Sequence, residues 1–482
     1  MVPGADARTV GKRERKWGAP RLWQIGESVM ADHQKHHGRY TGGLWQINGR
    51  VQISAGQLRY DDVMSTGDTF ALVTRNVERL VRDTLADTPV TVVQGARQVG
   101  KSTLVRQILP DAPPLTLNNA PTLAAAKADP VGFVRQNAGG LLAIDEVQRA
   151  PELILAIQDA VEEDRRPGRF LLTGSANLLN LRGAQESLAG RAETVELYGL
   201  SQGEVNGRVE TLIDRLLGGD SSAIRAGEFW LTRAQYAEII CAGSYPEPRL
   251  RTGVRRRSWF NNYLNRVLTR DAVDVSRLPH LDQLPKLLSL LAAQSSGEIV
   301  RARIANAAGI PPSSLPSYLK LLEDLYLIQV LPAWGENLTK RETDWPKIAL
   351  LDTGVVARLN NVTAEALGPA RVSNLAGDLF ETFVAGELRR GLGWSEHPAA
   401  LFHLRTRDRV EVDIVIEDDD RNVAGIEVKA SSTVDASDFK GLRFLQDKIG
   451  DRFTHGVVMY TGDKALPFGE RLTALPIQAL WA

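Results

Sequence analysis

Four residues near position 100 have the types and the spacing of a phosphate-binding loop. They are Gly95, Gly100, Lys101 and Ser102, within GARQVGKST, which fits the pattern GxxxxGK[ST]. Glycines let the backbone wrap closely around a polyanion, so that backbone N–H groups and the start of the next helix point at phosphate oxygens. We expect Lys101 to pair with the β- and γ-phosphates and Ser102 to give its hydroxyl to Mg²⁺. The pattern therefore predicts ATP with Mg²⁺ as cofactors.

The residues around this loop supply the context that the pattern requires. The apolar run VTVVQ precedes it and predicts a buried strand, and TLVRQIL follows it and predicts a helix that Thr103 helps to cap. A glycine-containing turn that matches by accident is the alternative. The expected nucleotide contacts are nine consecutive residues: Gly95, Ala96, Arg97, Gln98, Val99, Gly100, Lys101, Ser102 and Thr103.

Two neighbouring carboxylates, Asp145 and Glu146, end the apolar run GGLLAIDEVQ about forty residues further on. Neighbouring residues of a strand face opposite sides, so both carboxylates can serve one site only where the strand ends and the backbone turns. We expect Asp145 to hold the Mg²⁺ shell and Glu146 to orient or deprotonate the attacking water. An ordinary loop start would show the same two letters.

Two further polar groups are candidates for the same site. The strand FLLTGSAN ends in Thr173, Ser175 and Asn177, any of which could lie between the carboxylates and the γ-phosphate; of these we favour Ser175, with simple turn chemistry as the alternative. Arg191, in SLAGRAETVELYGLS, is a candidate for the guanidinium that stabilises transferring charge, or is an ordinary surface arginine.

The elements that must position these residues alternate between strands and helices. Short apolar runs at 140–147 and 169–175 are separated by helix-length stretches such as PELILAIQDAVEED, which predicts a parallel sheet covered on both faces. The expected organisation is α/β: an N-terminal extension (1–63), an ATPase domain (64–205), a helical linker or lid (206–280), a winged-helix-like unit (281–360) and an α+β unit (361–482).

The motifs resemble, in this order, those of a large prokaryotic family of AAA+ ATPases in which the ATPase domain precedes a domain of unknown function. The resemblance rests on GARQVGKST, AIDEVQ, LLTGSAN, LAGRAETVELYGLS and GSYPEPR, and it extends over about residues 71–465. It implies an AAA+ P-loop fold and nucleoside-triphosphate binding. Residues 1–63 fall outside the pattern, and the cluster His33, His36 and His37 within them lacks the ligands that would complete a metal site.

The next unit, 281–360, has the pattern of a winged helix-turn-helix, which the resemblance to the AAA+ family also suggests. LPKLLSLLAAQ and the stretch that follows predict three helices, the last over 313–327, and IQVLPAW with PKIALLDTG predicts a two-stranded wing. On DNA the third helix would enter the major groove. This helix carries two acidic residues, Glu323 and Asp324, against one lysine, Lys320, so it would bind DNA phosphates poorly. We therefore favour a role of this unit as an interdomain packing module.

Two carboxylates and a lysine near the C-terminus resemble the PD-(D/E)XK nuclease pattern. In RVEVDIVIE, apolar residues alternate with acidic ones, so Asp413 faces away from the core, and Glu427 and Lys429 do the same in GIEVKAS. With Glu381 from a preceding helix they form a possible second metal site, in which Lys429 would position a water. A half-exposed hairpin with a solvated charge pair shows the same pattern.

Composition indicates a globular protein with no general affinity for nucleic acid and no membrane span. The 482 residues are 43% hydrophobic and 24% charged, as in globular domains, and equal numbers of basic and acidic residues (58 each) give no global field that recruits nucleic acid. A single cysteine, Cys241, fits a reducing cytosol. The chain has no run of eighteen apolar residues and no apolar segment near its start, so we expect no membrane span, no secretory signal and a cytoplasmic location.

The function that these residues favour is a Mg²⁺-dependent AAA+ ATPase. Its nucleotide state would be relayed through the winged-helix-like unit to a nuclease-like or nucleic-acid-binding C-terminal unit. Arg191 would act in a neighbouring subunit, which favours an oligomer. The alternatives are a metal-dependent nuclease of DNA or RNA that ATP regulates, and a non-enzymatic switch that binds DNA.

Overall fold

The computed structural model describes residues 72–175, 188–219, 224, 227–294, 301–336, 346–368, 374–406 and 408–482. The chain divides into two units, Met1–Ala71 and Leu72–Ala482, and the described residues all belong to the second. The predicted extension (1–63), its three histidines and Asn177 therefore lie outside the described residues.

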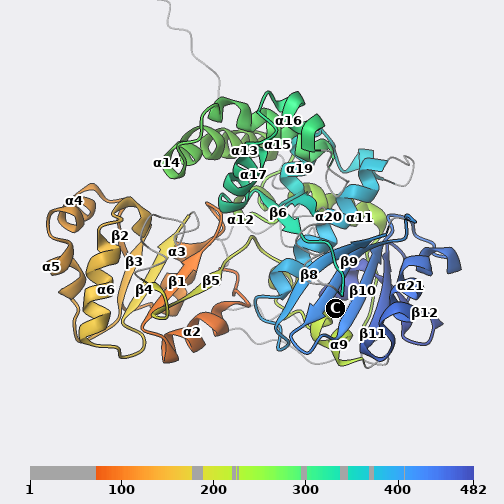
Figure 1. Ribbon diagram of the computed structural model, residues 1–482, viewed down its shortest axis with the longest axis horizontal. Coiled ribbons are helices and arrows are strands. Elements are labelled where there is room, and N and C mark those ends of the chain that lie inside the picture. Colours follow the sequence, from red (N-terminus) through yellow and green to blue (C-terminus); the bar gives the residue numbers. More distant parts are fainter. Residues whose placement is uncertain are drawn as a thin grey trace, which may run out of the picture. The chain divides into compact units, whose positions relative to one another are not determined.

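A five-stranded sheet with all neighbours parallel forms the first part of the described chain, as the alternating pattern predicted (Figure 1). Its strand order is β2-β3-β4-β1-β5. Three of the strands are buried along their whole length, as expected where helices cover both faces of a parallel sheet. The strands are β1 (Val90–Gln94), β2 (Leu115–Thr116), β3 (Leu142–Asp145), β4 (Phe170–Gly174) and β5 (Ala192–Glu196).

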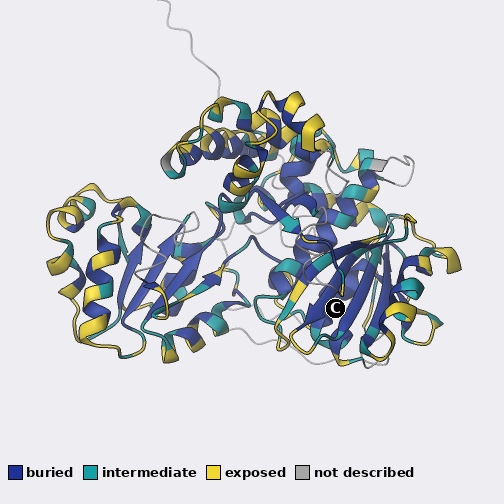
Figure 2. Ribbon diagram, viewed as in Figure 1, coloured by how far each residue is buried: buried dark blue, intermediate teal, exposed yellow. Residues whose placement is uncertain are grey.

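Helices on both faces of this sheet bury alternate residues of its strands. Val93 packs in one apolar cluster with residues of α2 and α3, whereas its neighbour Val92 packs in another with residues of α5 and α6. Figure 2 shows the strands buried and the outer sides of these helices exposed. The helices are α2 (Glu78–Asp87), α3 (Lys101–Ile108), α4 (Ala120–Ala128), α5 (Pro130–Arg135) and α6 (Leu153–Glu163).

The segment predicted as one helical linker, 206–280, packs in more than one place. Its first helix, α9, lies against strands of the C-terminal sheet, whereas α11 lies against α19 (Thr353–Leu359) and α13 continues into a five-residue π-helix, η3. The elements are α8 (Gln202–Val205), α9 (Leu212–Gly218), α11 (Arg233–Ala242), α12 (Pro246–Arg249), α13 (Gly253–Arg266), η3 (Val267–Asp271) and α14 (Ala272–Val275).

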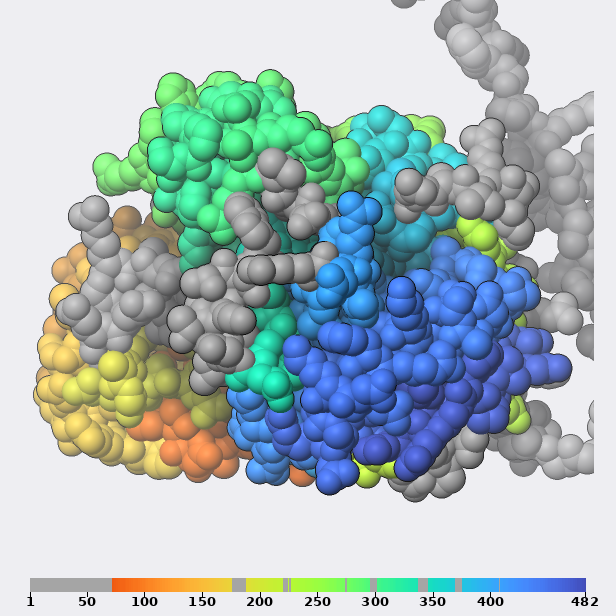
Figure 3. All heavy atoms as spheres, turned by 45° about the vertical axis from the view of Figure 1, so that its right-hand side comes forward, coloured from red at the N-terminus to blue at the C-terminus, as the bar shows by residue number. Residues whose placement is uncertain are grey.

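Three helices and an antiparallel strand pair follow, which is the predicted order of elements. The helices are α15 (Leu284–Ala293), α16 (Arg301–Ala308) and α17 (Leu315–Asp324), and α17 is shorter than the predicted 313–327. Strands β6 (Ile328–Leu331) and β7 (Lys347–Leu350) pair antiparallel. Trp334, just after β6, donates its indole N–H to Glu417 at 2.6 Å, so this segment packs on the C-terminal unit. Figure 3 shows its mint-green surface beside the blue C-terminal residues.

A mixed six-stranded sheet, in the order β12-β13-β11-β10-β9-β8, forms the C-terminal unit. Helices α9 and α20 pack with one apolar cluster of its side chains, and α21 packs with the other. The strands are β8 (Ala399–Arg405), β9 (Glu411–Asp418), β10 (Val423–Val428), β11 (Phe453–Tyr460), β12 (Leu466–Gly469) and β13 (Leu472–Pro476). The helices are α20 (Asn374–Gly391) and α21 (Lys440–Ile449).

Strand β9 does not follow the predicted alternation along its whole length, because it contains an irregularity. Leu404 pairs with Val412 but Phe402 pairs with Val415, so β9 carries one extra residue at this point. Ile414 and Ile416 consequently pack in the cluster on the α20 side, whereas Val412 packs in the cluster on the α21 side. The sequence pattern wrongly placed all three on one face.

Candidate functional site

The loop between β1 and α3 takes the course that its glycines permit. A Cβ on Gly95 would lie 2.0 Å from the carbonyl oxygen of Leu197, so only glycine lets the loop pass the backbone after β5. Gly100 has a φ of 106°, which a residue with a side chain rarely adopts, and it immediately precedes α3. The first turn of α3 contains no acidic residue, so its free N–H groups keep their attraction for an anion.

Lys101 is turned back onto the loop. Its Nζ donates to the carbonyl oxygens of Gly95 at 2.9 Å and Ala96 at 2.8 Å, and the residue is buried. Burial lowers the pKa of Lys101 to about 8, against the opposing effect of Glu146 and Asp145. The ammonium thus has only neutral acceptors, and phosphate oxygens would offer it the stronger, charge-assisted hydrogen bonds.

Asp145 connects the phosphate-binding loop to the end of β4. Its Oδ1 accepts hydrogen bonds from the hydroxyls of Ser102 at 2.9 Å and Thr173 at 2.5 Å. The hydroxyl and the carboxylate are oxygen donors of the kind Mg²⁺ prefers, and phosphate oxygens and waters usually complete such a shell. The residues therefore fit a magnesium ion held by Ser102 and Asp145 beside a nucleotide.

The backbone turns directly after Asp145, as the sequence argument required. Glu146 has a φ of 62° and precedes the single 3₁₀ turn η1 (Val147–Arg149), so neighbouring carboxylates both lie at the carboxyl edge of the sheet. Gln148 donates one hydrogen bond to Glu146 Oε2 and another, of 3.0 Å, to Ser175 Oγ. Ser175, the favoured candidate, thus reaches Glu146 through Gln148, and Thr173 is the residue in contact with Asp145.

The C-terminal candidates are brought together, but around a lysine that sequence reasoning missed. Lys347, the first residue of β7, bonds Glu381 through its Nζ, which also lies 3.6 Å from Asp413 Oδ1. Lys429 Nζ bonds Glu427 Oε1 at 3.0 Å. Among the described ranges, no group of three or more His, Cys, Asp or Glu residues is arranged to hold a metal ion.

Comparison with known proteins divides the chain into three matched segments. Residues 87–206 match the family model of an AAA domain. Residues 233–366 and 376–480 match two families that are each described as a domain of unknown function, DUF8612 and DUF4143. The AAA match and the parallel sheet together support an AAA-type, nucleotide-binding ATPase.

Two similar proteins are mycobacterial. Uncharacterized proteins of Mycobacterium bovis (Mb2031c) and Mycobacterium tuberculosis (Rv2008c) are each 29% identical over 405 residues, covering 83% of this chain and 83% of each relative. A crystal structure of a signal transduction ATPase with numerous domains, PH0952 from Pyrococcus horikoshii, is 14% identical with a TM-score of 0.24. The match covers 68% of this chain and 46% of that one. No helix in the described part of the chain is long and apolar enough to cross a membrane.

Arg191 lies at the edge of the AAA sheet opposite to the phosphate-binding loop. Its carbonyl oxygen accepts from the N–H of Val90 at the start of β1, whereas the loop follows the end of that strand. Its guanidinium forms an ion pair of 2.6 Å with Glu162. In its own chain, therefore, Arg191 does not face the phosphate-binding loop, and the predicted role requires a second subunit.

Arg97, within the loop, is bound by a residue that lies outside the AAA domain and that sequence reasoning missed. Its Nε donates to Asp271 Oδ2 at 2.5 Å, and Asp271 ends the π-helix η3. The Asp271 side chain is 9% exposed, and its other oxygen, Oδ1, is buried with no hydrogen-bond partner among the described residues. The segment after α13 thus supplies an anion to the phosphate-binding loop.

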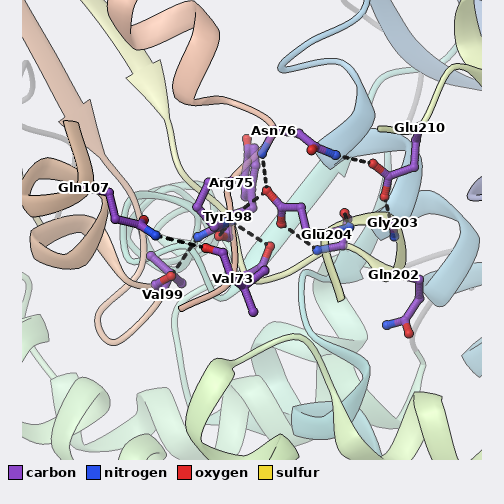
Figure 4. Close-up of polar contacts among 12 residues, drawn as sticks. Val73, Arg75, Asn76, Val99, Gln107, Tyr198, Gln202, Gly203, Glu204 and Glu210 are labelled. Atoms are coloured by element: carbon purple, nitrogen blue, oxygen red, sulfur yellow. Dashed lines mark hydrogen bonds and ion pairs between the residues drawn. The ribbon is translucent and has the colours of Figure 1, made fainter. Parts of the chain in front are cut away.

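Arg75 forms a second connection beneath the loop, shown in Figure 4. Its guanidinium donates to the carbonyl oxygen of Val99 at 3.0 Å, to that of Tyr198 at 2.8 Å and to Glu204 Oε1 at 2.9 Å. Glu204 also closes the capping box of α8, with Ser201. The network ties the loop to the segment after β5. No sequence motif pointed to Arg75 because its partners lie 24 to 129 residues away.

Proposed function

We propose that this chain is a Mg²⁺-dependent AAA-type ATPase. The observation that carries the proposal is the contact of Ser102 with Asp145 at 2.9 Å, next to Lys101 in the phosphate-binding loop. A hydroxyl and a carboxylate from two different motifs meet where a magnesium ion on the phosphates would need them. The match of residues 87–206 to AAA domains supports the same assignment.

In this proposal the residues of the site divide the work of phosphoryl transfer. The backbone of residues 95–103 and Lys101 hold the phosphates, Ser102 and Asp145 hold Mg²⁺, and Glu146 orients the attacking water. Thr173 fixes the orientation of Asp145, and Gln148 with Ser175 fixes that of Glu146. Arg191 would reach the transferring phosphate only from a neighbouring subunit.

The nucleotide state would be passed to the C-terminal unit by direct contacts. The N–H of Gln202 in α8 donates to Glu387 Oε2 of α20 at 2.7 Å, and α8 is tied to the loop through Glu204 and Arg75. This connection supports a relay that does not require the three-helix unit as its only route. The likeness of that unit to a winged helix, and of the C-terminal sheet to PD-(D/E)XK nucleases, remains part of the proposal.

The test measures Mg²⁺-dependent ATP turnover and nucleotide binding in parallel. Lys101→Ala should abolish turnover and weaken ATP binding, and Asp145→Asn should abolish turnover with a smaller effect on binding. Matched controls are Lys127→Ala on the exposed side of α4 and Asp159→Asn on α6, which should keep wild-type rates. ATP turnover that persists in Lys101→Ala would remove the proposal.

The alternative of a DNA-binding switch finds little support in the third helix of the middle unit. The Lys320 ammonium lies 3.1 Å from Glu323 and 3.2 Å from Asp324, so its charge is already neutralised within α17. The affinity for duplex DNA, measured with ATP and with ADP, tests this alternative, because a switch must bind DNA differently in the two nucleotide states and equal affinity would exclude it.

A further inference from the structure

The acidic cluster of the C-terminal unit is built around a lysine. The Lys347 side chain is 7% exposed, and its Nζ bonds Glu381 of α20. The same Nζ lies 3.6 Å from Asp413 Oδ1 and 3.7 Å from Glu411 Oε1, two acidic residues of β9. One ammonium group thus faces three carboxylates from two elements of the C-terminal unit.

The lysine comes from outside the sheet that carries the acids. It is the first residue of β7, which pairs with β6 and not with the six-stranded sheet. One of the acids is fixed independently of the lysine: Asp413 Oδ2 accepts from the N–H of Val428 at 2.9 Å, while Asp413 Oδ1 faces Lys347. The ammonium therefore occupies a position at which carboxylates of the C-terminal unit favour a cation.

The residues present do not fit a divalent ion in the position that the PD-(D/E)XK resemblance implies. A magnesium or manganese ion here would need one or two of these carboxylates as direct ligands, with oxygens at about 2.0 to 2.3 Å. The Lys347 ammonium already lies among those oxygens, and two positive groups cannot share that space without strong repulsion. The remaining candidate acid, Glu427, accepts from Lys429 on Oε1 at 3.0 Å, and its Oε2 is buried without a hydrogen-bond partner among the described residues. One such oxygen does not by itself make a divalent-metal site. In agreement, the described residues contain no arrangement that could hold a metal.

The charge of the Lys347 ammonium is compensated by its surroundings. Three carboxylates, from Glu381, Glu411 and Asp413, lie within 4 Å of its Nζ. If the lysine were removed, several carboxylates would share a largely buried site without compensation, which is costly. Such a site would attract a replacement cation.

We infer that the Lys347 ammonium is the resident cation of this site and takes the place of a divalent metal. The C-terminal unit consequently does not bind Mg²⁺ or Mn²⁺ at Glu381 and Asp413. Its cation is instead part of β7, so the site joins β7, α20 and β9 and is not available for metal-dependent hydrolysis. This inference does not depend on the proposed ATPase activity.

The test is Mn²⁺ binding to the full chain, measured by electron paramagnetic resonance without nucleotide. Every protein carries Asp145→Asn, so that the phosphate-binding loop contributes no ion. The parent should bind no Mn²⁺ that depends on Asp413. Lys347→Gln should gain about one Mn²⁺ per chain, and adding Asp413→Asn should abolish the gain. Lys347→Arg, which keeps a cation in place, is the matched control and should behave as the parent.

Two results would overturn the inference. One is Mn²⁺ binding by the parent that Asp413→Asn removes, because the metal would then coexist with Lys347. The other is a folded Lys347→Gln protein that gains no Mn²⁺. If Lys347→Gln does not fold, the comparison of the parent with its Asp413→Asn variant decides alone: equal Mn²⁺ binding supports the inference, and a difference refutes it.

Discussion

A single carboxylate oxygen organises the chemistry of the phosphate-binding site. Asp145 Oδ1 accepts from both Ser102 and Thr173, so the orientation of the proposed magnesium ligand depends on two hydroxyls, one in the first turn of α3 and one near the end of β4. If Ser102 bound a metal ion, as we propose, Thr173 would be the group that keeps Asp145 in place. Supporting hydrogen bonds of this kind are often nearly as important as the ligands themselves.

Thr173→Val should therefore lower ATP turnover without abolishing nucleotide binding. It replaces the hydroxyl by a methyl group of similar shape and leaves the buried Asp145 with one donor fewer. A hydrogen bond to a charged group contributes about 1.5 to 3 kcal/mol, so we expect kcat to fall about tenfold or more while the ATP Kd changes little. Steady-state kinetics and a nucleotide-binding titration measure the two quantities.

Two variants make this prediction specific. Thr173→Ser keeps the hydroxyl and should restore most of the rate. Ser175→Ala removes a hydroxyl that, among the described residues, bonds Gln148 and not Asp145, so it should have a smaller effect. A larger loss in Ser175→Ala than in Thr173→Val would show that the Gln148 contact to Glu146 is the more important one.

At the scale of elements, the phosphate-binding loop is held from two sides. Arg75, ahead of α2, binds the carbonyl of Val99, and Asp271, at the end of η3, binds the side chain of Arg97. The first contact joins parts of the AAA fold, but the second joins the loop to the segment after α13. A π-helix at this point is itself a common sign of a functional position.

Asp271→Asn should strengthen nucleotide binding. A bound triphosphate and Asp271 would compete for the Arg97 guanidinium, and they would repel each other. Two unit charges 4 Å apart interact by about 1 kcal/mol in water and by more within a protein, so the ATP Kd should fall about fivefold or more. Displacement of a fluorescent nucleotide measures the change, and Asp282→Asn, an exposed site nearby in sequence, is the control.

The opposite result for Asp271 is equally informative. Weaker binding in Asp271→Asn would mean that the carboxylate orients Arg97 towards the phosphates and does not compete with them. Arg97→Ala separates the two contributions. In that background the ion pair is absent, so any effect of Asp271→Asn that remains measures the direct repulsion between Asp271 and the phosphates.

The elements also show what local sequence can predict. GxxxxGKS, with a strand before it and a helix after it, specifies the loop because every determinant lies within about fifteen residues. The choice of Ser175 over Thr173 was wrong for the contact with Asp145, because that choice depends on strand register. Ile144 pairs with Leu172, which brings Asp145 level with Thr173 and not with Ser175.

Long-range contacts explain the residues that sequence reasoning missed. The partner of Asp271 lies 174 residues away, and the partners of Lys347 lie at least 34 residues away. The extra residue of β9 likewise has no sequence signal.

At the scale of the whole molecule, one buried carboxyl joins the AAA domain to the C-terminal helix α20. Glu387 accepts from the N–H of Gln202 through Oε2 and from Arg390 through Oε1. Burial raises the pKa of Glu387 from 4.5 to about 7, with Glu210 adding to the rise and Arg390 and Arg249 opposing it. The folded chain therefore retains a proton here at pH values where the unfolded chain has lost it.

This proton makes stability depend on pH in a defined direction. Between pH 4.5 and about 7 the native state binds more protons than the unfolded state, so the contribution of Glu387 falls as pH rises and is constant above about 7. At about 1.4 kcal/mol per pKa unit, the loss of stability is at most about 3 kcal/mol.

Glu387→Gln keeps a neutral acceptor and should remove this pH-dependent contribution to stability. The apparent melting temperature of wild type minus that of Glu387→Gln should therefore decrease from pH 5 to pH 7 and then level off. Glu470→Gln, an exposed site, should give a profile parallel to wild type. A difference that rises with pH would mean that the Arg390 ion pair, and not burial, dominates at this junction.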